Sequence, residues 1–242
     1  MHASDIDTMA GQAALPDEIW TPPAPSVAGR LPAMGQKDSS VKAVLVGGNS
    51  PCHVYAESSI EERVAVVLLT RPDVVRLEEQ LKPVSYVDIH GENRQHWFDF
   101  RATFDDGHRI AIAVKPARKA IAMRLKEELD HLALQLHRSF ADGVRLMTEL
   151  DVPRDVVHDA RLLHAVRRDP PCEADDAVRD LVASLAGTIS VGDIVRHTGL
   201  GATAFRAVAR QIGSGDIRVV GAPRIDYATR VARGHGLDRR AA

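Results

Sequence analysis

Residues 96–116, HWFDFRATFDDGHRIAIAVKP, alternate apolar and polar positions on both sides of a turn, with the two-residue period of β-strands. The apolar positions of each predicted strand share one face: Phe98, Phe100, Ala102 and Phe104 in the first strand, and Ile110, Ile112 and Val114 in the second. A slip of one residue would turn one of these sets away from the core, so the pattern fixes the parity of the pairing. Two single charges, Asp99 and Lys115, fall on the opposite face.

The turn sequence predicts the register of this hairpin. A two-residue turn at Asp106-Gly107 would set the two apolar faces against each other, whereas a three-residue loop over 106–108 unites them. We therefore expect the three-residue loop, with a positive φ at Gly107, and we expect it to place Asp99 opposite Lys115.

Other segments of the first two thirds of the chain alternate between helix and strand patterns. A helix is expected from Ser58 or Ser59 to Pro72, because a capping residue and two acidic residues, Glu61 and Glu62, precede an apolar run. A short apolar run at 41–46 ends at Gly47-Gly48. Short strands or extended segments are expected at 74–80 and 84–89, and a further strand at 143–149. Helices are expected at 117–141 and 153–168, the first with helical spacing of Ile121, Leu125, Leu129, Leu132 and Leu136.

Pro170-Pro171 marks a boundary, after which three short helices are expected at 174–187, 190–199 and 202–215. Gly187, Gly199 and Gly213 suit their C-terminal caps, and Ser190 suits an N-cap. Residues 216–228 read as a two-stranded wing. Three helices followed by a hairpin predict a winged helix-turn-helix domain.

The first forty residues are rich in Pro, Ala, Gly and Ser and have little periodicity, which is typical of a disordered or weakly docked tail that Trp20 could anchor. The expected organisation is thus a tail at 1–40, an α/β domain at 41–169 and a winged-helix domain at 170–242.

Charge and composition narrow the function classes. The 242 residues carry a net charge of −2, so any nucleic-acid surface must be local. From Ile194 onward there are nine arginines, three aspartates and no lysine, a local charge of +6. Arg206 and Arg210, one turn apart on the third helix, are candidate DNA contacts. Two distant cysteines, and the absence of a leader or a bilayer-spanning apolar run, indicate a cytoplasmic protein without a membrane partner.

Asp99 and Lys115 allow two interpretations. One is an ordinary cross-strand ion pair, which contributes roughly 0.2–1 kcal/mol. The other is a metal-dependent nuclease site, where a carboxylate holds Mg²⁺ and an ammonium stabilises charge that grows on phosphorus. Such a cation needs several oxygen ligands, and the acidic start of the preceding helix could supply a second one.

The order of a helix Glu, a strand Asp and a Lys on the next strand resembles the PD-(D/E)XK, or restriction-endonuclease-like, fold. More narrowly, SIEERVAVVLL, RLEEQ, FDF, IAVKP and GVRLMTE, between about Glu57 and Glu149, resemble the TnsA family of transposon endonucleases. That resemblance implies a mixed sheet flanked by helices, DNA cleavage beside a partner transposase, and a C-terminal helical DNA-binding domain. It also implies Mg²⁺ or Mn²⁺ as cofactor.

Carried over residue by residue, the resemblance assigns Glu61 as the helix acid, Asp99 as the metal-binding acid and Lys115 as the catalytic lysine. A small misalignment would exchange Glu61 for Glu57 or Glu62.

Ala113 departs from the family pattern, which has Asp, Glu or Gln at this position. Alanine leaves only a backbone carbonyl as a metal ligand, so a catalytically inactive relative that binds DNA is the alternative, and a transcription regulator is a third possibility. Arg118 and Lys119 follow the lysine strand and could meet a phosphate, or could simply be a solvated helix start.

Overall fold

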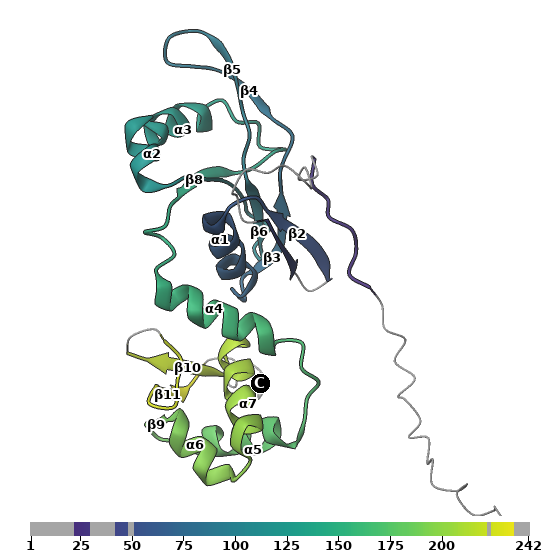
Figure 1. Cartoon of the computed structure of the whole chain (residues 1–242), viewed down its shortest axis with the longest axis vertical. Coiled ribbons are helices and arrows are strands. Elements are labelled where there is room, and N and C mark those ends of the chain that lie inside the picture. Colours follow the sequence, from purple (N-terminus) through teal and green to yellow (C-terminus); the bar gives the residue numbers. More distant parts are fainter. Residues whose placement is uncertain (1–21, 30–41, 48–50, 222–223, 235–242) are drawn as a thin grey trace, which may run out of the picture.

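The computed structural model describes residues 22–29, 42–47, 51–221 and 224–234, which form an α/β unit and a smaller helical unit along one long axis (Figure 1). Separate clusters of buried side chains stabilise the two units. Helix α4 (Arg154–Val166) lies between them in Figure 1 and contributes Val157 and Ala160 to the core of the α/β unit.

A mixed four-stranded sheet organises the α/β unit. Its order is β3-β6-β7-β8, with β7 antiparallel to β6 and parallel to β8. The strands are β3 (Val74–Glu79), β6 (Phe100–Phe104), β7 (Arg109–Val114) and β8 (Gly143–Met147). Helix α1 (Ser59–Leu69) covers one face, where Phe100, Ile112 and Val114 are buried, and α2 (Ala117–Ala122) and α3 (Leu125–Ala133) cover the face that holds Ala111 and Ala113. The expected mixed sheet flanked by helices is confirmed.

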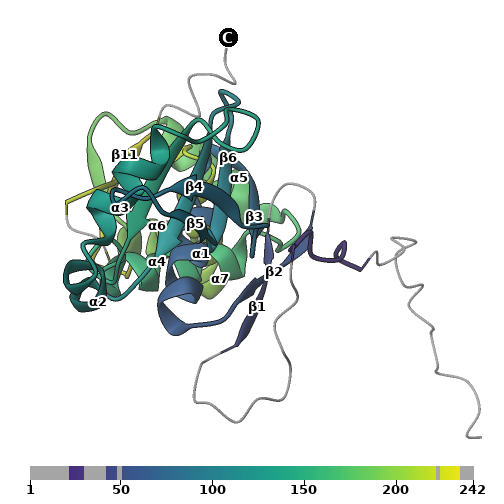
Figure 2. The same ribbon diagram turned by 90° about the horizontal axis from the view of Figure 1, so that it is seen from above.

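Two hairpins flank this sheet. The strands β1 (Ala43–Gly47) and β2 (Cys52–Ala56) form an antiparallel pair that Figures 1 and 2 show beside α1. The strands β4 (Val84–Val87) and β5 (Asn93–His96) form a second pair at the tip of the molecule. The sequence pattern does not predict β2 or β5. In β5 the polar residues NRQH carry no strand pattern, and pairing with β4 decides their conformation.

The hairpin β6–β7 has the expected parity but a register shifted by two residues. Phe100 pairs with Ile112 and Ala102 with Ile110, and the loop is 105–107 rather than 106–108. Gly107 has the expected positive φ, +86°, at the last loop position, where a left-handed residue closes a three-residue hairpin. The predicted pairing of Asp99 with Lys115 is therefore wrong. Phe98 also leaves the predicted face, because the chain bends at Asp99 and Phe98 packs with Ala111 and Ala113.

The single helix predicted over 117–141 is two helices. Arg124 adopts a left-handed conformation with a φ of 48°, and this turn separates α2 from α3. Leu125, Leu129 and Leu132 are buried as their spacing predicts, whereas Ile121 is 77% exposed because the turn takes it out of phase with them.

The helical unit contains α5 (Glu173–Ala183), α6 (Val191–Thr198) and α7 (Gly201–Gly213), close to the predicted helices. Ser190 caps α6 and Gly199 ends it with a φ of 69°, as expected. Gly187 and Gly213 are not caps, because Ser184 and Ser214 occupy those positions. A three-stranded sheet, β10-β11-β9, completes the unit. Its strands are β9 (Thr188–Ser190), β10 (Ile217–Val220) and β11 (Arg230–Arg233), so the second strand of the hairpin begins later than predicted.

Residues 22–29 of the predicted tail are docked against the α/β unit. Ala24 forms a parallel bridge with Cys52, the Ser26 hydroxyl donates to the buried carboxylate of Glu79, and Gly29 N–H donates to Gln80 O at 2.9 Å. Of the two alternatives for the tail, disordered or weakly docked, this segment therefore follows the second. The rest of the tail, with Trp20, lies outside the described residues.

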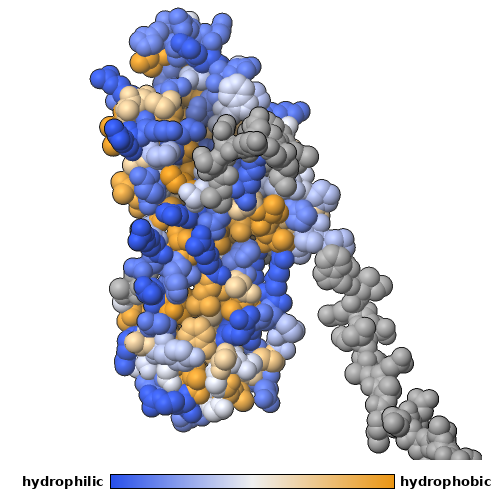
Figure 3. Space-filling model, in the orientation of Figure 1, coloured by the Kyte–Doolittle hydropathy of each residue, from blue (hydrophilic) through white to orange (hydrophobic). Residues whose placement is uncertain are grey.

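Hydrophilic side chains dominate the surface around β4 and β5, as the space-filling view shows (Figure 3). Within the described ranges no helix could cross a bilayer, because the longest, α4 and α7, have 13 residues where about 20 are needed. Cys52 and Cys172 are both free thiols.

Candidate active site

Glu61 occupies the first turn of α1, where its carboxylate caps the helix. One oxygen accepts from Glu57 N–H at 2.7 Å and the other from the Ser58 hydroxyl at 2.9 Å, while the Ser58 oxygen accepts from Glu61 N–H. This reciprocal arrangement is similar to a capping box, except that Glu61 accepts from the N–H of Glu57 rather than from that of the cap residue Ser58. Glu61 is 9% exposed, and these hydrogen bonds hold its carboxylate in one orientation.

Asp99 lies immediately before β6, at the point where β6 and β7 stop pairing through their backbones. Its N–H donates to Ile112 O at 3.0 Å, and its carboxylate accepts from Val114 N–H at 2.6 Å. The pKa of Asp99 is raised to about 6. Burial is the largest cause and the Glu61 and Glu57 carboxylates add to it, whereas the hydrogen bond from Val114 N–H and the Lys115 ammonium act in the opposite direction. Asp99 is thus a carboxyl group whose ionisation responds to Glu61 and Lys115 together.

Lys115 and Ala113 mark the end of β7. Lys115 N–H donates to Met147 O at 3.1 Å, which fixes this residue at the end of the parallel β7–β8 ladder. Ala113 is 1% exposed and packs against the α2–α3 layer. Its side chain is a methyl group and offers no ligand to a metal. As expected from the sequence, the backbone carbonyl of Ala113 is the group at this position that could bind a metal.

The alternatives for the helix acid are now distinguishable by their contacts. Glu62 pairs with Arg161 of α4 at 2.6 Å, so its carboxylate is directed toward α4. Glu61 and Glu57 both act on the charge of Asp99, and Glu61 has the larger effect. Of the three candidates, Glu61 has the best position for a site shared with Asp99, and Glu57 remains a neighbour of that site.

A divalent cation would find two suitable carboxylates here, those of Asp99 and Glu61. Across the described residues, no group of three His, Cys, Asp or Glu side chains comes together as a metal site. The Glu61 and Glu57 carboxylates repel the charge of Asp99 and raise its pKa, and a bound cation would reduce this repulsion. The fit is therefore partial: two anionic ligands are in place, and the remaining ligands would have to be backbone oxygens, water or substrate oxygens.

Two further residues that the sequence did not single out adjoin this site. The His96 imidazole packs on Phe98 with ring centroids 4.7 Å apart, and its buried Nε2 has no hydrogen-bond partner in the described chain. Burial and the nearby Lys115 lower the pKa of His96, although Glu128 raises it. Glu149 accepts from Ala117 N–H at 2.8 Å and so fixes the segment that follows Lys115. His96 was missed because it lies in β5, whose sequence gives no strand signal.

The predicted phosphate contacts Arg118 and Lys119 are exposed in the first turn of α2, two and three residues beyond Pro116. No ion pair engages either side chain within the described residues, so both remain available to an anion near the end of β7.

Arg206 and Arg210 of α7 do not present a free basic face. Arg210 is ion-paired with Asp175 at 2.7 Å and Asp169 at 3.0 Å, and its side chain is only 13% exposed. Arg206 pairs with Asp169 at 2.6 Å. The assignment of Arg210 as a DNA contact does not fit this geometry, since its donors are engaged by two carboxylates. Arg206 is 46% exposed and would have to leave Asp169 to bind a phosphate.

Comparison of the sequence with models of known protein families and with curated proteins found no match.

Proposed function

We propose that this protein is a metal-dependent DNA endonuclease of the TnsA-like type, acting in DNA transposition beside a partner transposase in the cytoplasm. The observation that supports it most is electrostatic: the pKa of Asp99, immediately before β6, is shifted both by the Glu61 carboxylate on α1 and by the Lys115 ammonium after β7. An acid from a helix and an acid and a lysine from neighbouring strands are the parts that a restriction-endonuclease-like site uses.

Each residue has a defined part in this proposal. Asp99 and Glu61 would hold Mg²⁺ or Mn²⁺, with the Ala113 carbonyl as a further oxygen ligand; such an ion would polarise the scissile phosphate and favour ionisation of a bound water. Lys115 would stabilise the negative charge that develops on the phosphate oxygens. Arg118 and Lys119 would position the strand through its backbone phosphates.

The helical unit would hold the duplex as a winged helix, with α7 as the recognition helix. Its N-terminal residues Gly201, Ala202 and Thr203 are exposed, as readout by the start of a helix requires. Because Arg210 is engaged in ion pairs, the phosphate contacts in this proposal move to exposed arginines such as Arg218, which pairs with no carboxylate among the described residues.

A plasmid-nicking assay tests the proposal. Purified protein with supercoiled DNA and Mg²⁺ or Mn²⁺ should give nicked circles, and Asp99→Ala and Lys115→Ala should each lower the rate at least 100-fold. Asp106→Ala, in the exposed loop between β6 and β7, is the matched control and should leave nicking unchanged. Nicking that survives Asp99→Ala would place the chemistry elsewhere.

A second candidate is a DNA-binding relative without cleavage activity. Ala113, together with the missing third acidic ligand, favours it. Metal titration separates the two candidates even if nicking needs a partner protein. An active site should show Mg²⁺-dependent thermal stabilisation at pH 7.5 that Asp99→Asn removes, whereas an inactive relative should show none.

A further inference from the structure

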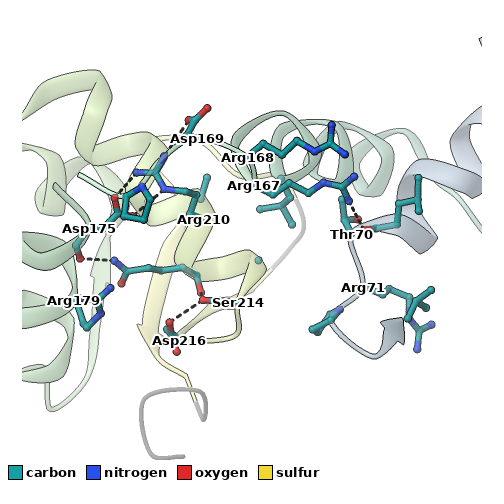
Figure 4. Close-up of a pocket in the computed structure, with 18 of the residues that line it drawn as sticks. Thr70, Arg71, Arg167, Arg168, Asp169, Asp175, Arg179, Arg210, Ser214 and Asp216 are labelled. Atoms are coloured by element: carbon teal, nitrogen blue, oxygen red, sulfur yellow. Dashed lines mark hydrogen bonds and ion pairs between the residues drawn. The ribbon is translucent and has the colours of Figure 1, made fainter. Parts of the chain in front are cut away.

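A cavity of about 660 Å³ lies between the two units, at the opposite end of α1 from Glu61. It is lined by the segment after α1, the C-terminal end of α4, and residues of α5 and α7 (Figure 4). Leu69, which lines it, is eight residues beyond Glu61 on α1, about 12 Å along the helix axis. The cavity is therefore distinct from the candidate active site.

One wall of this cavity carries positive charge that carboxylates do not neutralise. Arg167 donates to Leu69 O at 2.8 Å and to Val46 O, which are neutral acceptors. Arg168, its neighbour in sequence, is exposed and forms no ion pair with any described residue. Figure 4 shows these two side chains on the side of the cavity nearest Thr70. Burial and the charge of Arg168 lower the pKa of Arg167, as expected where two cations lie together without a counter-ion.

The other cations of the cavity are neutralised. Arg210 is held by Asp169 and Asp175, Arg71 by Asp73, and Arg179 by Asp176 at 2.5 Å. The charge that remains open to a ligand is therefore concentrated at Arg167 and Arg168. An exposed guanidinium is a strong donor to phosphate oxygens, which it can bind through two parallel hydrogen bonds.

Apolar side chains complete the cavity. Leu69, Pro72 and Leu163 line it together with Pro51 and Pro171. Its volume lies within the range of small-molecule sites, about 300–1,000 Å³, and is far too small for a duplex. A ligand that fits would carry a phosphate at one end and a compact, largely apolar body, such as a ring system, at the other.

We propose that this interdomain cavity binds a nucleotide, with its phosphate on Arg168 and Arg167 and its base against Leu69, Pro72 and Leu163. The nucleotide can be free in solution or can be the 5′-phosphorylated end of a DNA strand, because both present the same chemistry. The site does not depend on the nuclease function.

Isothermal titration calorimetry of the full chain in EDTA tests this site without any metal chemistry. AMP should bind, and adenosine and inorganic phosphate should each bind at least tenfold more weakly, because each lacks one half of the recognised group. Arg168→Ala should weaken AMP binding at least tenfold and Arg168→Glu should abolish it. Arg138→Ala, an exposed arginine outside the cavity, should leave the affinity within twofold of the wild type.

A tetrathymidylate with and without a 5′ phosphate distinguishes the two sources. A strand-end ligand requires the phosphorylated form to bind at least as tightly as AMP, in an Arg168-dependent way, and a free nucleotide requires AMP to bind more tightly. Absence of AMP binding, AMP binding that Arg168→Glu leaves unchanged, or phosphate that binds as tightly as AMP would overturn the assignment. Arg168 is exposed, so its variants should fold, and circular dichroism checks this.

Discussion

At the scale of single residues, the surroundings of Asp99 destabilise its charged form in the folded protein. Asp99 is a carboxyl group whose pKa is raised to about 6 by burial and by the Glu61 and Glu57 carboxylates. The ordinary pKa of an aspartate side chain, taken for the unfolded chain, is 3.8. The folded chain therefore binds more protons between these two values, and its stability falls as the pH rises through this interval.

Replacing Asp99 by Asn should thus stabilise the protein at neutral pH. The charge costs on the order of 2–3 kcal/mol above pH 6, and the Asn oxygen can still accept from Val114 N–H. Thermal unfolding between pH 4 and 8 should show a higher melting temperature for Asp99→Asn above pH 6 and a flatter pH profile. An Asp99→Asn protein that is less stable than wild type at pH 7.5 would mean that this carboxylate serves structure.

At the scale of secondary-structure elements, α7 is held by a cluster of charges that its sequence position does not suggest. Arg210 reaches Asp175, which is 7% exposed in the first turn of α5, and Asp169 in the segment before it. The Arg210 guanidinium holds the pKa of Asp175 below its usual value, against the effect of burial. Asp175 therefore contributes stability at neutral pH that is lost as the pH falls through its folded-state pKa.

Arg210→Met, which keeps most of the volume of the side chain, should destabilise the protein by about 2–4 kcal/mol, because it leaves Asp175 buried without its cation. Arg206→Met, one turn away and 46% exposed, should cost less than about 1 kcal/mol. Urea unfolding of both variants measures the difference. Equal effects of the two substitutions would contradict the distinction that we draw between them.

At the scale of the whole molecule, α4 joins the two units through contacts on both sides. Asp159 of α4 accepts from the N–H groups of Arg224 at 2.8 Å and Ile225 at 2.6 Å, in the segment between β10 and β11. Ile225 is 4% exposed, so this contact fixes a buried part of the helical unit on α4. The nucleotide cavity depends on the same arrangement, since its walls come from both units.

Asp159→Ala should loosen the junction, because two backbone donors lose their acceptor at a cost of about 1–3 kcal/mol. Hydrogen exchange should become faster at residues 224 and 225 and in the segment around Asp169, while the strands of the α/β sheet stay protected. Asp155→Ala is the matched control: Asp155 is on the same helix, but its pair with Arg224 is 3.8 Å long and exposed, so exchange should not change. Unchanged exchange in Asp159→Ala would show that the units are held by other contacts.

The local sequence was sufficient for most strands and for the helices, apart from the break between α2 and α3 at Arg124. The cap at Ser58 with Glu61 begins α1, and alternation fixes which faces of β6 and β7 meet the α1 layer, because only one parity buries both apolar sets. The mixed α/β organisation could be read at this level, whereas a family resemblance, and not a local pattern, grouped Glu61, Asp99 and Lys115. The shift of the β6–β7 register by two residues could not be read from the local sequence, because two registers of equal parity bury the same faces. The left-handed Gly107 at the end of the loop distinguishes the two registers.

Only the tertiary structure decided what comes together across the chain. Partners distant in sequence determine the ion pairs of Arg210, the docking of residues 22–29 on Glu79 and the strand conformation of β5. No local sequence pattern predicts these features. The same is true of the effect of Glu61 and Lys115 on Asp99, and of the two arginines that face the interdomain cavity. Periodicity and capping act over a few residues, whereas burial and charge act through space.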